Sequence, residues 1–228
     1  MLNEFANDVR ELTGGPVNIE ILPSGSVVGN REKALISVAW NWALERDYIT
    51  LDNPTKVVKP NDEKPRDHYV TDKEYNIAYQ LAEGTPYLRP AMELAYLCRM
   101  KRCEILAATK KHILKEGFDT QRVKGSKDAI TFWSDRLVAA VNYKASEIES
   151  FYIIHNRYGQ RIPESAFKSA WTRLKKKMKK AGIEPFNFHD LKAKGGTDFN
   201  GDVLDATGHL DPKMRKVYKR KLEVEATR

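Results

Sequence analysis

The last quarter of the chain contains three short stretches, Phe188-His189-Asp190-Leu191-Lys192, Gly208-His209 and Lys216-Val217-Tyr218-Lys219-Arg220. Two histidines and one tyrosine therefore stand among lysines and arginines, on segments that are predicted to be helical. A phenol oxygen can act as a nucleophile, imidazoles can move or hold protons, and cations can stabilise the non-bridging oxygens of a phosphate. This combination of side chains suits chemistry on a phosphodiester.

The order and spacing of these residues resemble the tyrosine recombinases of the phage integrase family. His189-Asp190-Leu191-Lys192 is similar to the family's His-x-x-Arg box, and Gly208-His209 is similar to its Gly-His box. Tyr218 follows the second histidine by nine residues, which is the usual spacing of the family's nucleophile. The resemblance implies a mainly α-helical fold with a small antiparallel β-sheet, of the α+β class.

Two further positions of the family's motifs can be assigned in the middle of the chain. The motif Thr-Gly-x-Arg-x-x-Glu aligns on Glu104, which places Lys101 where the family has an arginine. A predicted hairpin over 120–133 carries Lys124 where the family has a lysine at the end of the first strand. Because Lys192 also replaces the arginine of the His-x-x-Arg box, both arginine positions hold lysine in this chain.

The resemblance implies a role for each of these residues. Tyr218 would attack a DNA phosphodiester to give a 3′-phosphotyrosyl link, with His189 assisting its proton and Lys124 protonating the leaving 5′-oxygen. The remaining groups would stabilise the charge of the transition state, and they are His209, Lys101 and Lys192. The bond energy is kept in the protein–DNA ester, so the resemblance implies no metal ion and no other cofactor.

The composition favours a polyanionic partner. The chain of 228 residues has 39 Lys+Arg against 31 Asp+Glu, a net charge of +8 and a sequence pI of about 9.3. The densest charge run lies on a predicted helix that begins near Pro163, and it is either a solvated face or a phosphate-contacting face. The candidate DNA-contacting residues are Arg102, Lys127, Arg173, Lys176, Lys177 and Lys180. We expect double-stranded DNA as the partner, and the resemblance implies a homo-tetramer on paired sites.

The chain is expected to form two domains. A helix is predicted over 31–44, with Asn30 as its N-cap and with an apolar face formed by Leu35, Val38, Ala39 and Trp42. It is similar to the last helix of the family's core-binding domain, so 1–58 is interpreted as a partial, helical DNA-binding domain. The polar, proline-punctuated stretch 59–68 is interpreted as a linker, and 69–228 as the catalytic domain.

Other functional classes are disfavoured by the sequence. No apolar run approaches the roughly 20 residues that a membrane span needs, and no signal peptide opens the chain. We therefore expect a soluble protein of the cytoplasm, in a bacterial or phage-type setting, with no membrane contact. Cys98 and Cys103 fall within one predicted helix and offer neither a disulfide framework nor a zinc site, so both are expected to be reduced and buried.

Three functions remain open at this point. The first is an active site-specific recombinase, and the second is a catalytically impaired relative that binds DNA as a regulator or accessory factor. The lysines at the two arginine positions favour the second, because an ammonium cannot reproduce the bidentate, planar contact that a guanidinium makes with phosphate. The third is a basic helical protein that binds RNA or other proteins, in which case the motif residues would lie far apart.

Overall fold

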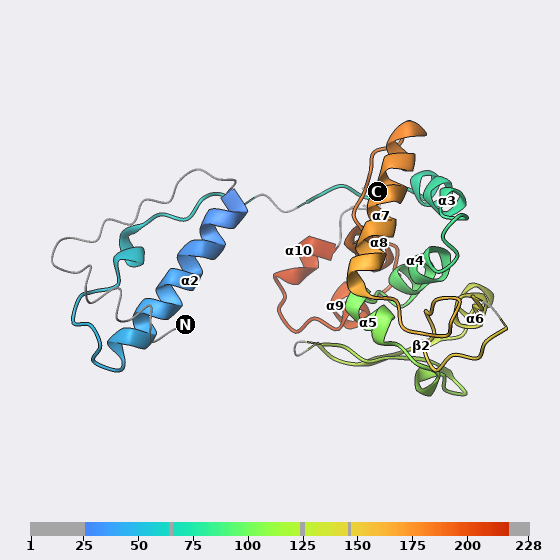
Figure 1. The fold of residues 1–228 in the computed structure, drawn as a ribbon, viewed down its shortest axis with the longest axis horizontal. Coiled ribbons are helices and arrows are strands. Elements are labelled where there is room, and N and C mark those ends of the chain that lie inside the picture. Colours follow the sequence, from blue (N-terminus) through green and yellow to red (C-terminus); the bar gives the residue numbers. More distant parts are fainter. Residues whose placement is uncertain (1–25, 64–65, 124–125, 146, 219–228) are drawn as a thin grey trace, which may run out of the picture. The chain divides into compact units, whose positions relative to one another are not determined.

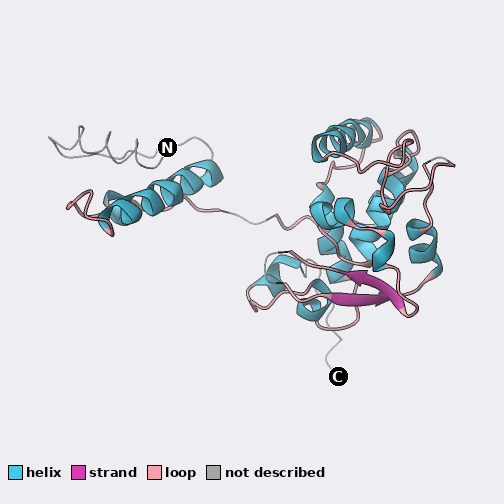
Figure 2. Ribbon diagram, turned by 60° about the horizontal axis from the view of Figure 1, so that its bottom comes forward, coloured by secondary structure: helices cyan, strands magenta, loops and turns pink. Residues whose placement is uncertain are grey.

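The computed structural model describes residues 26–63, 66–123, 126–145 and 147–218. The chain divides into two units, Met1–Pro65 and Arg66–Arg228 (Figure 1). The described residues form mainly helices, together with a two-stranded antiparallel sheet in the larger unit (Figure 2). The predicted α+β class with a small antiparallel sheet is therefore confirmed. In the described part of the chain, no helix is long and apolar enough to cross a membrane.

The smaller unit is built around one long helix. Helix α2 (Ser26–Leu44) is followed by a turn and the short 3₁₀ helix η1 (Pro54–Val57). The indole Nε1 of Trp40 donates a hydrogen bond of 3.0 Å to the carbonyl oxygen of Leu51, which ties the returning chain to the helix. The buried apolar cluster of this unit consists of Trp40, Ala43 and Ile49.

The helix predicted over 31–44 is present, but one prediction for it is wrong. Asn30 is not an N-cap, because α2 already begins at Ser26. Its side chain instead donates to the carbonyl oxygen of Asn61 and accepts from the Asn61 amide, both at 2.8 Å. Leu35 and Val38 are 70% and 68% exposed, because the side of the helix that carries the buried cluster is a different one.

The larger unit contains most of the described elements. In chain order these are α3 (Asp72–Leu81), α4 (Leu88–Leu97), α5 (Arg102–Ala107), η2 (Lys110–His112), β1 (Gly117–Thr120), β2 (Ala129–Phe132), α6 (Asp135–Val141), α7 (Glu164–Lys180), α8 (Phe188–Thr197), α9 (Val203–Thr207) and α10 (Met214–Tyr218). Helix α3 begins with a capping box, in which the Thr71 side chain accepts from the Glu74 amide and the Glu74 carboxylate accepts from the Thr71 amide.

Helix α4 forms the centre of the core and packs against α6 and α8. A Cβ atom on Gly195 of α8 would lie 2.0 Å from the carbonyl oxygen of Tyr96, so glycine allows the two helices to come this close. Next to Gly195, the buried ammonium of Lys194 donates to Asp72 at 2.6 Å and to Asp198 at 2.9 Å. Helix α8 is thereby fixed against both α3 and α4.

The two strands form a hairpin, as predicted, but the first strand lies earlier in the chain than expected: β1 ends at Thr120, so 121–123, which were expected to be strand, belong to the connecting loop. Strand β1 pairs antiparallel with β2, with Gly117 opposite Phe132. The connecting loop reaches the segment after α9, where the backbone amide of Lys127 donates to the carbonyl oxygen of Gly208 at 2.9 Å. Gly208 has a φ of +70°, and a Cβ atom there would lie 2.4 Å from the Lys127 carbonyl oxygen, so this contact requires glycine. Lys124, in the same loop, lies outside the described residues.

The two cysteines do not share a helix. Cys98 is buried at the C-terminal end of α4, whereas Cys103 lies on α5 and is exposed. The prediction that both are buried in one helix is therefore wrong. The reason is the turn between α4 and α5, which redirects the chain and points the later cysteine outward.

Candidate active site

The tyrosine and both histidines of the motifs lie together. The Nε2 atom of His189, on α8, is 3.2 Å from the hydroxyl oxygen of Tyr218, on α10. The His209 ring stacks on the Tyr218 ring, with centroids 4.9 Å apart and an interplanar angle of 21°. On the same ring, the Nζ atom of Lys192 lies 5.5 Å from the centroid. Residues separated by up to 29 positions in sequence thus surround one phenol, which is itself only 3% exposed.

Lys101 belongs to the same cluster of charges. It precedes α5, its Nζ atom is 3.8 Å from Oε1 of the buried Glu104, and it donates to the Val123 carbonyl oxygen at 3.5 Å. Its positive charge is close enough to lower the pKa of both Lys192 and His209. The structure therefore brings together five of the six predicted catalytic residues, and the sixth, Lys124, is the one outside the described part of the chain.

Burial and positive charge together set the protonation of this pocket. Burial, together with the nearby charge of Arg122 and against the opposing effect of Glu104, lowers the pKa of Lys192 to about 7. Burial, followed by the charges of Lys192 and Lys101, lowers the pKa of His209 to about 4. At neutral pH the His209 ring is therefore uncharged, and Lys192 is only partly charged.

The pocket has unmet hydrogen-bonding capacity that suits an anion. The buried Nε2 atom of His209 has no hydrogen-bond partner among the residues that the structure describes. A neutral imidazole can donate a hydrogen bond from this atom to a phosphate oxygen. Within the same described residues, no group of three His, Cys, Asp or Glu side chains could hold a metal ion. The groups that the pocket offers an anion are the His209 imidazole and the ammonium groups of Lys101 and Lys192.

A groove of about 500 Å³ adjoins this pocket between α5, α7 and α8. Lys101 and His189 line it at the pocket end, and the basic residues along it are Arg102, Lys168 and Lys175. Arg102 also forms an ion pair with Glu164 across the groove. Of the six predicted DNA-contacting residues only Arg102 lines the groove. Lys168 and Lys175 were not predicted, although their spacing of seven residues would place both on one face of α7.

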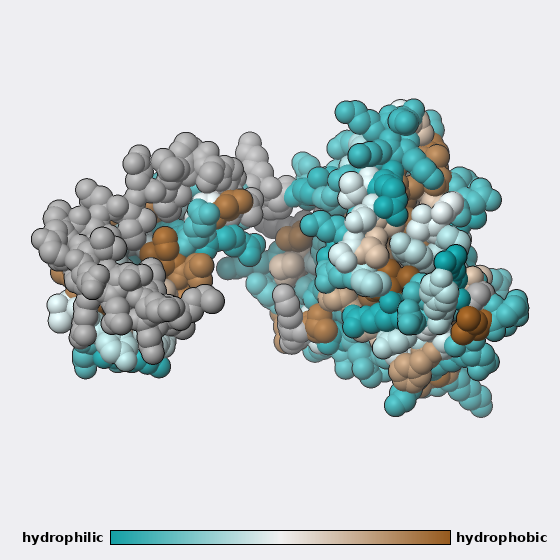
Figure 3. Space-filling model, viewed as in Figure 1, coloured by the Kyte–Doolittle hydropathy of each residue, from teal (hydrophilic) through white to brown (hydrophobic). Residues whose placement is uncertain are grey.

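The other predicted DNA-contacting residues lie elsewhere on the surface. Lys127 is exposed in the hairpin loop. The remaining four are exposed on α7, outside the lining of the groove, and they are Arg173, Lys176, Lys177 and Lys180. The surface over the C-terminal end of α7, at the top of the view, is mostly hydrophilic (Figure 3). Lys177 reaches across to donate to the Leu81 carbonyl oxygen at 3.3 Å.

Comparisons with known proteins identify the fold. Neither a protein-family model nor a curated protein gives a significant match to the sequence. Among solved structures, a lambda integrase dimer bound to a COC′ core site matches with a TM-score of 0.74 and 19% identity, over 100% of this chain and 82% of that chain. The Tn1549 transposon integrase in complex with circular intermediate DNA gives 0.64 and 17%, over 99% and 80%. XerA recombinase gives 0.57 and 14%, over 97% and 94%. The chain has the tyrosine recombinase fold.

The resemblance that the motif residues indicated is thus confirmed at the level of the fold. Alignment of the tyrosine recombinase motif Thr-Gly-x-Arg-x-x-Glu on Glu104 puts Arg99 at the glycine position. Arg99 has a φ of 52°, in the left-handed region that favours glycine. Its Nε atom donates to the Ala206 carbonyl oxygen at 3.1 Å, and its guanidinium lies 5.0 Å from the centroid of the Phe199 ring. The turn before Lys101 therefore keeps the backbone shape of a glycine turn while carrying an arginine.

One buried arginine beside the pocket was not predicted. Arg122 follows β1, its side chain is 1% exposed, and its NH1 atom lies 3.5 Å from Oε2 of Glu104. Burial lowers the pKa of Arg122, and the charge of Glu104 counters the effect. The sequence holds no signal for this role, because an arginine two residues before Lys124 looks like a solvated residue of a hairpin loop.

Proposed function

We propose that this chain binds double-stranded DNA and cuts and rejoins it through a covalent link to Tyr218. The observation that supports the proposal most directly is the convergence, in a tyrosine recombinase fold, of one phenol, two imidazoles and two ammonium groups in a single pocket. An accidental match of short motifs gives no reason for these side chains to meet, so the convergence argues against the third function considered above.

The geometry supports a role for His189 in the proton transfer. In the proposed step, the Tyr218 hydroxyl oxygen attacks phosphorus and its proton passes to His189 Nε2, 3.2 Å away. The bond from phosphorus to the 5′-oxygen breaks, and that oxygen takes a proton from Lys124, an assignment that rests on the motif alone. The product is a 3′-phosphotyrosyl ester and a free 5′-hydroxyl, and rejoining is the same sequence in reverse.

The surrounding groups would stabilise the negative charge that develops on the non-bridging oxygens. His209 would donate from its Nε2 atom, which has no hydrogen-bond partner within the described part of the chain, and Lys101 and Lys192 would supply positive charge. One well-placed donor of this kind contributes roughly 3 kcal/mol to the transition state, which is about a hundredfold in rate. Because a lysine cannot make the bidentate contact of an arginine, the two replacements are expected to lower the rate of the reaction.

The groove beside the pocket is the proposed path of the DNA backbone. Arg102, Lys168 and Lys175 would contact the phosphates that flank the reacting one, and the exposed lysines of α7 would add to the electrostatic attraction. Lambda integrase, one of the similar structures, has been solved as a tetramer bound to a Holliday junction. We propose the same arrangement for this chain, with 1–58 as a second DNA-contacting domain joined through 59–68, and action on DNA within the cell.

The second candidate is a relative that binds DNA without cutting it, and the two lysines are the observation that favours it. A covalent adduct separates the two. DNA that co-purifies with the protein is sequenced to define its site, and a nicked duplex of that site is used to trap the intermediate. We expect an adduct on a denaturing gel that is absent with Tyr218→Phe and retained with Tyr158→Phe, a control at a tyrosine that is 58% exposed. Tight binding of the site by the wild-type protein without any adduct would assign the chain to the second candidate.

A further inference from the structure

Arg122 makes hydrogen bonds to two separate segments of the larger unit. Its NH1 atom donates to the Arg99 carbonyl oxygen at 2.5 Å, and its NH2 atom donates to the Cys98 carbonyl oxygen at 3.0 Å. Both acceptors belong to the turn that leads into α5. NH2 also donates to the Ala206 carbonyl oxygen at 3.4 Å, near the end of α9. One guanidinium from the hairpin loop therefore holds the backbone on two sides.

The same guanidinium is paired with a carboxylate that organises the start of α5. Glu104 accepts from the backbone amide of Lys101 at 2.6 Å and from the amide of Val123 at 3.3 Å. Arg122 NH1 lies 3.5 Å from this carboxylate, and both side chains are excluded from solvent. The ion pair between Arg122 and Glu104 therefore links the backbone of Lys101 to the hairpin loop, in which Lys124 stands.

Each of the three segments that meet at Arg122 carries or adjoins one of the predicted catalytic residues. The turn before α5 presents Lys101, the hairpin loop carries Lys124, and the end of α9 leads directly into His209. We propose that Arg122 is a positioning residue. Its planar guanidinium holds these three segments at fixed positions relative to one another, which the flexible ammonium groups of Lys101 and Lys192 cannot do. The catalytic consequence rests on the proposed function, whereas the structural consequence does not.

The chemistry of the side chain explains why arginine is required. A guanidinium offers N–H donors in a rigid plane, so that one group can meet several carbonyl oxygens and a carboxylate at once, whereas an ammonium on a flexible stem cannot hold that arrangement. Its charge also acts on the pocket, because Arg122 contributes to the lowered pKa of Lys192 and of His209. The other charged or titratable groups near His209 include Lys192, Lys101, His189 and Tyr218, so Arg122 is one part of a larger set of groups that act on this ring.

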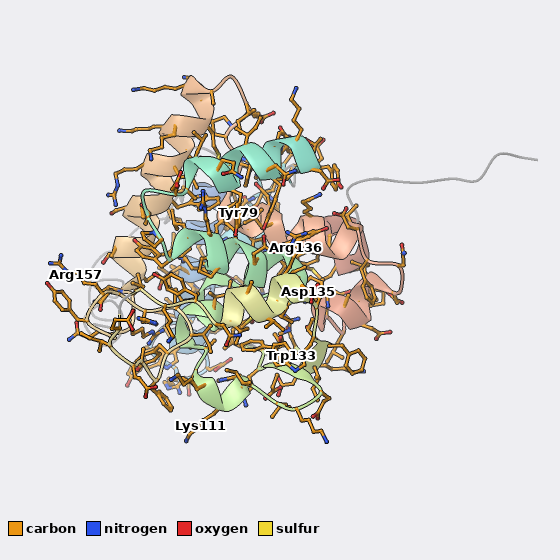
Figure 4. All side chains as sticks on the ribbon, turned by 90° about the vertical axis from the view of Figure 1, so that its right-hand side faces the viewer. Tyr79, Lys111, Trp133, Asp135, Arg136 and Arg157 are labelled. Carbon is orange, nitrogen blue, oxygen red and sulfur yellow. The ribbon has the colours of Figure 1, made fainter. Side chains whose placement is uncertain are left out.

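Two variants separate geometry from charge. Arg122→Lys keeps a positive charge and loses the planar fork, and Arg122→Met loses both. Arg136→Lys is the matched control, because Arg136 also donates two hydrogen bonds, both of 2.9 Å, to a buried carboxylate, that of Glu93. Arg136 lies on the face that is turned to the viewer in Figure 4. This face is the right-hand side of Figure 1, whereas α10 lies on the left-hand side of the larger unit.

The first measurement needs no DNA. In hydrogen–deuterium exchange of the whole protein, we expect Arg122→Lys and Arg122→Met to speed exchange in residues 98–104 and 204–210 by about tenfold or more, as lost charge-assisted hydrogen bonds imply. Arg136→Lys should leave both segments unchanged. In an NMR titration, the pKa of His209 should rise with Arg122→Met and stay close to the wild-type value with Arg122→Lys. Wild-type exchange in both segments with Arg122→Lys would overturn the proposal, whether or not Arg122→Met folds.

The second measurement uses the nicked DNA duplex. With Arg122→Lys, the rate of adduct formation should fall by about a hundredfold, because small displacements of catalytic groups are costly, while DNA affinity stays within about twofold. A wild-type protein that forms no adduct would refute the proposed cleavage but not the role of Arg122, which the exchange experiment decides. Unchanged adduct formation with Arg122→Lys in an active wild-type background would refute the role.

Discussion

The buried ammonium of Lys192 predicts that DNA affinity falls as the pH rises above neutrality. In the free protein, burial and the charge of Arg122 lower the pKa of Lys192 to about 7. A phosphate in the pocket would favour the charged form and raise that pKa. Binding above pH 7 must therefore be accompanied by the uptake of one proton, and the cost of protonating the amine reduces the affinity.

The size of the effect follows from the pKa. At one pH unit above a pKa of about 7, about one tenth of the free molecules carry the charge, so the association constant should fall by about tenfold per unit, or about 1.4 kcal/mol. The dependence should begin near pH 7 and end at the pKa of Lys192 in the complex. His209 does not contribute to it, because its pKa of about 4 lies far below this range.

Fluorescence anisotropy with a labelled duplex, at fixed ionic strength between pH 6 and 9, measures this dependence. The decisive variant is Lys192→Arg, whose guanidinium stays charged throughout and should remove the decline. Lys101→Arg is the matched control and should keep it, since Lys192 is still present. An affinity that is flat from pH 6 to 9 in the wild type, or an unchanged decline with Lys192→Arg, would refute the assignment of Lys192 to the phosphate site.

Three further predictions concern the pocket and the groove beside it. The double variant Lys101→Arg with Lys192→Arg should raise the rate of adduct formation, by about a hundredfold where both guanidinium groups reach the phosphate; a lower rate on the nicked duplex would contradict this. Lys192→Met should raise the free energy of unfolding at pH 7 on the order of 3 kcal/mol, as measured by urea titration. Between pH 7 and 10 only the unfolded wild-type chain binds the proton at Lys192, so the wild type should gain stability as the pH rises, and the variant should not show this gain. Replacing both Lys168 and Lys175 by Gln should reduce the magnitude of the slope of log affinity against log salt concentration by about 2. A larger change with Lys176→Gln and Lys180→Gln would instead place the DNA on the outer face of α7.

The elements that local chemistry determines could be predicted from the sequence. The capping box at Thr71 and Glu74 and the apolar stripe of α7 depend on residues a few positions apart, and the structure contains both. The hairpin was also predicted, although its first strand ends at Thr120, earlier than expected. The resemblance also placed Tyr218 and His189 in one site, because the spacing of such motifs is set by a fold that the chain shares.

The features that were missed depend on tertiary packing. Leu35 and Val38 have the spacing of a buried face, yet the turn back to Ile49 covers a different side of the helix. Arg122 has no local signature, because its acceptors lie about 23 and 84 residues away in the chain. The lowered pKa of Lys192 depends on packing in the same way, because its main cause is the burial of Lys192 itself and the next is the charge of Arg122.

A structure of the protein bound to a duplex of its own site would test most directly whether the pocket is a phosphate site. We predict one phosphodiester within hydrogen-bonding distance of the Lys101 and Lys192 ammonium groups and of His209 Nε2, with the Tyr218 hydroxyl in line with the 5′-oxygen. A complex in which the nearest phosphate contacts only the outer lysines of α7, and the pocket faces no DNA, would contradict the assignment.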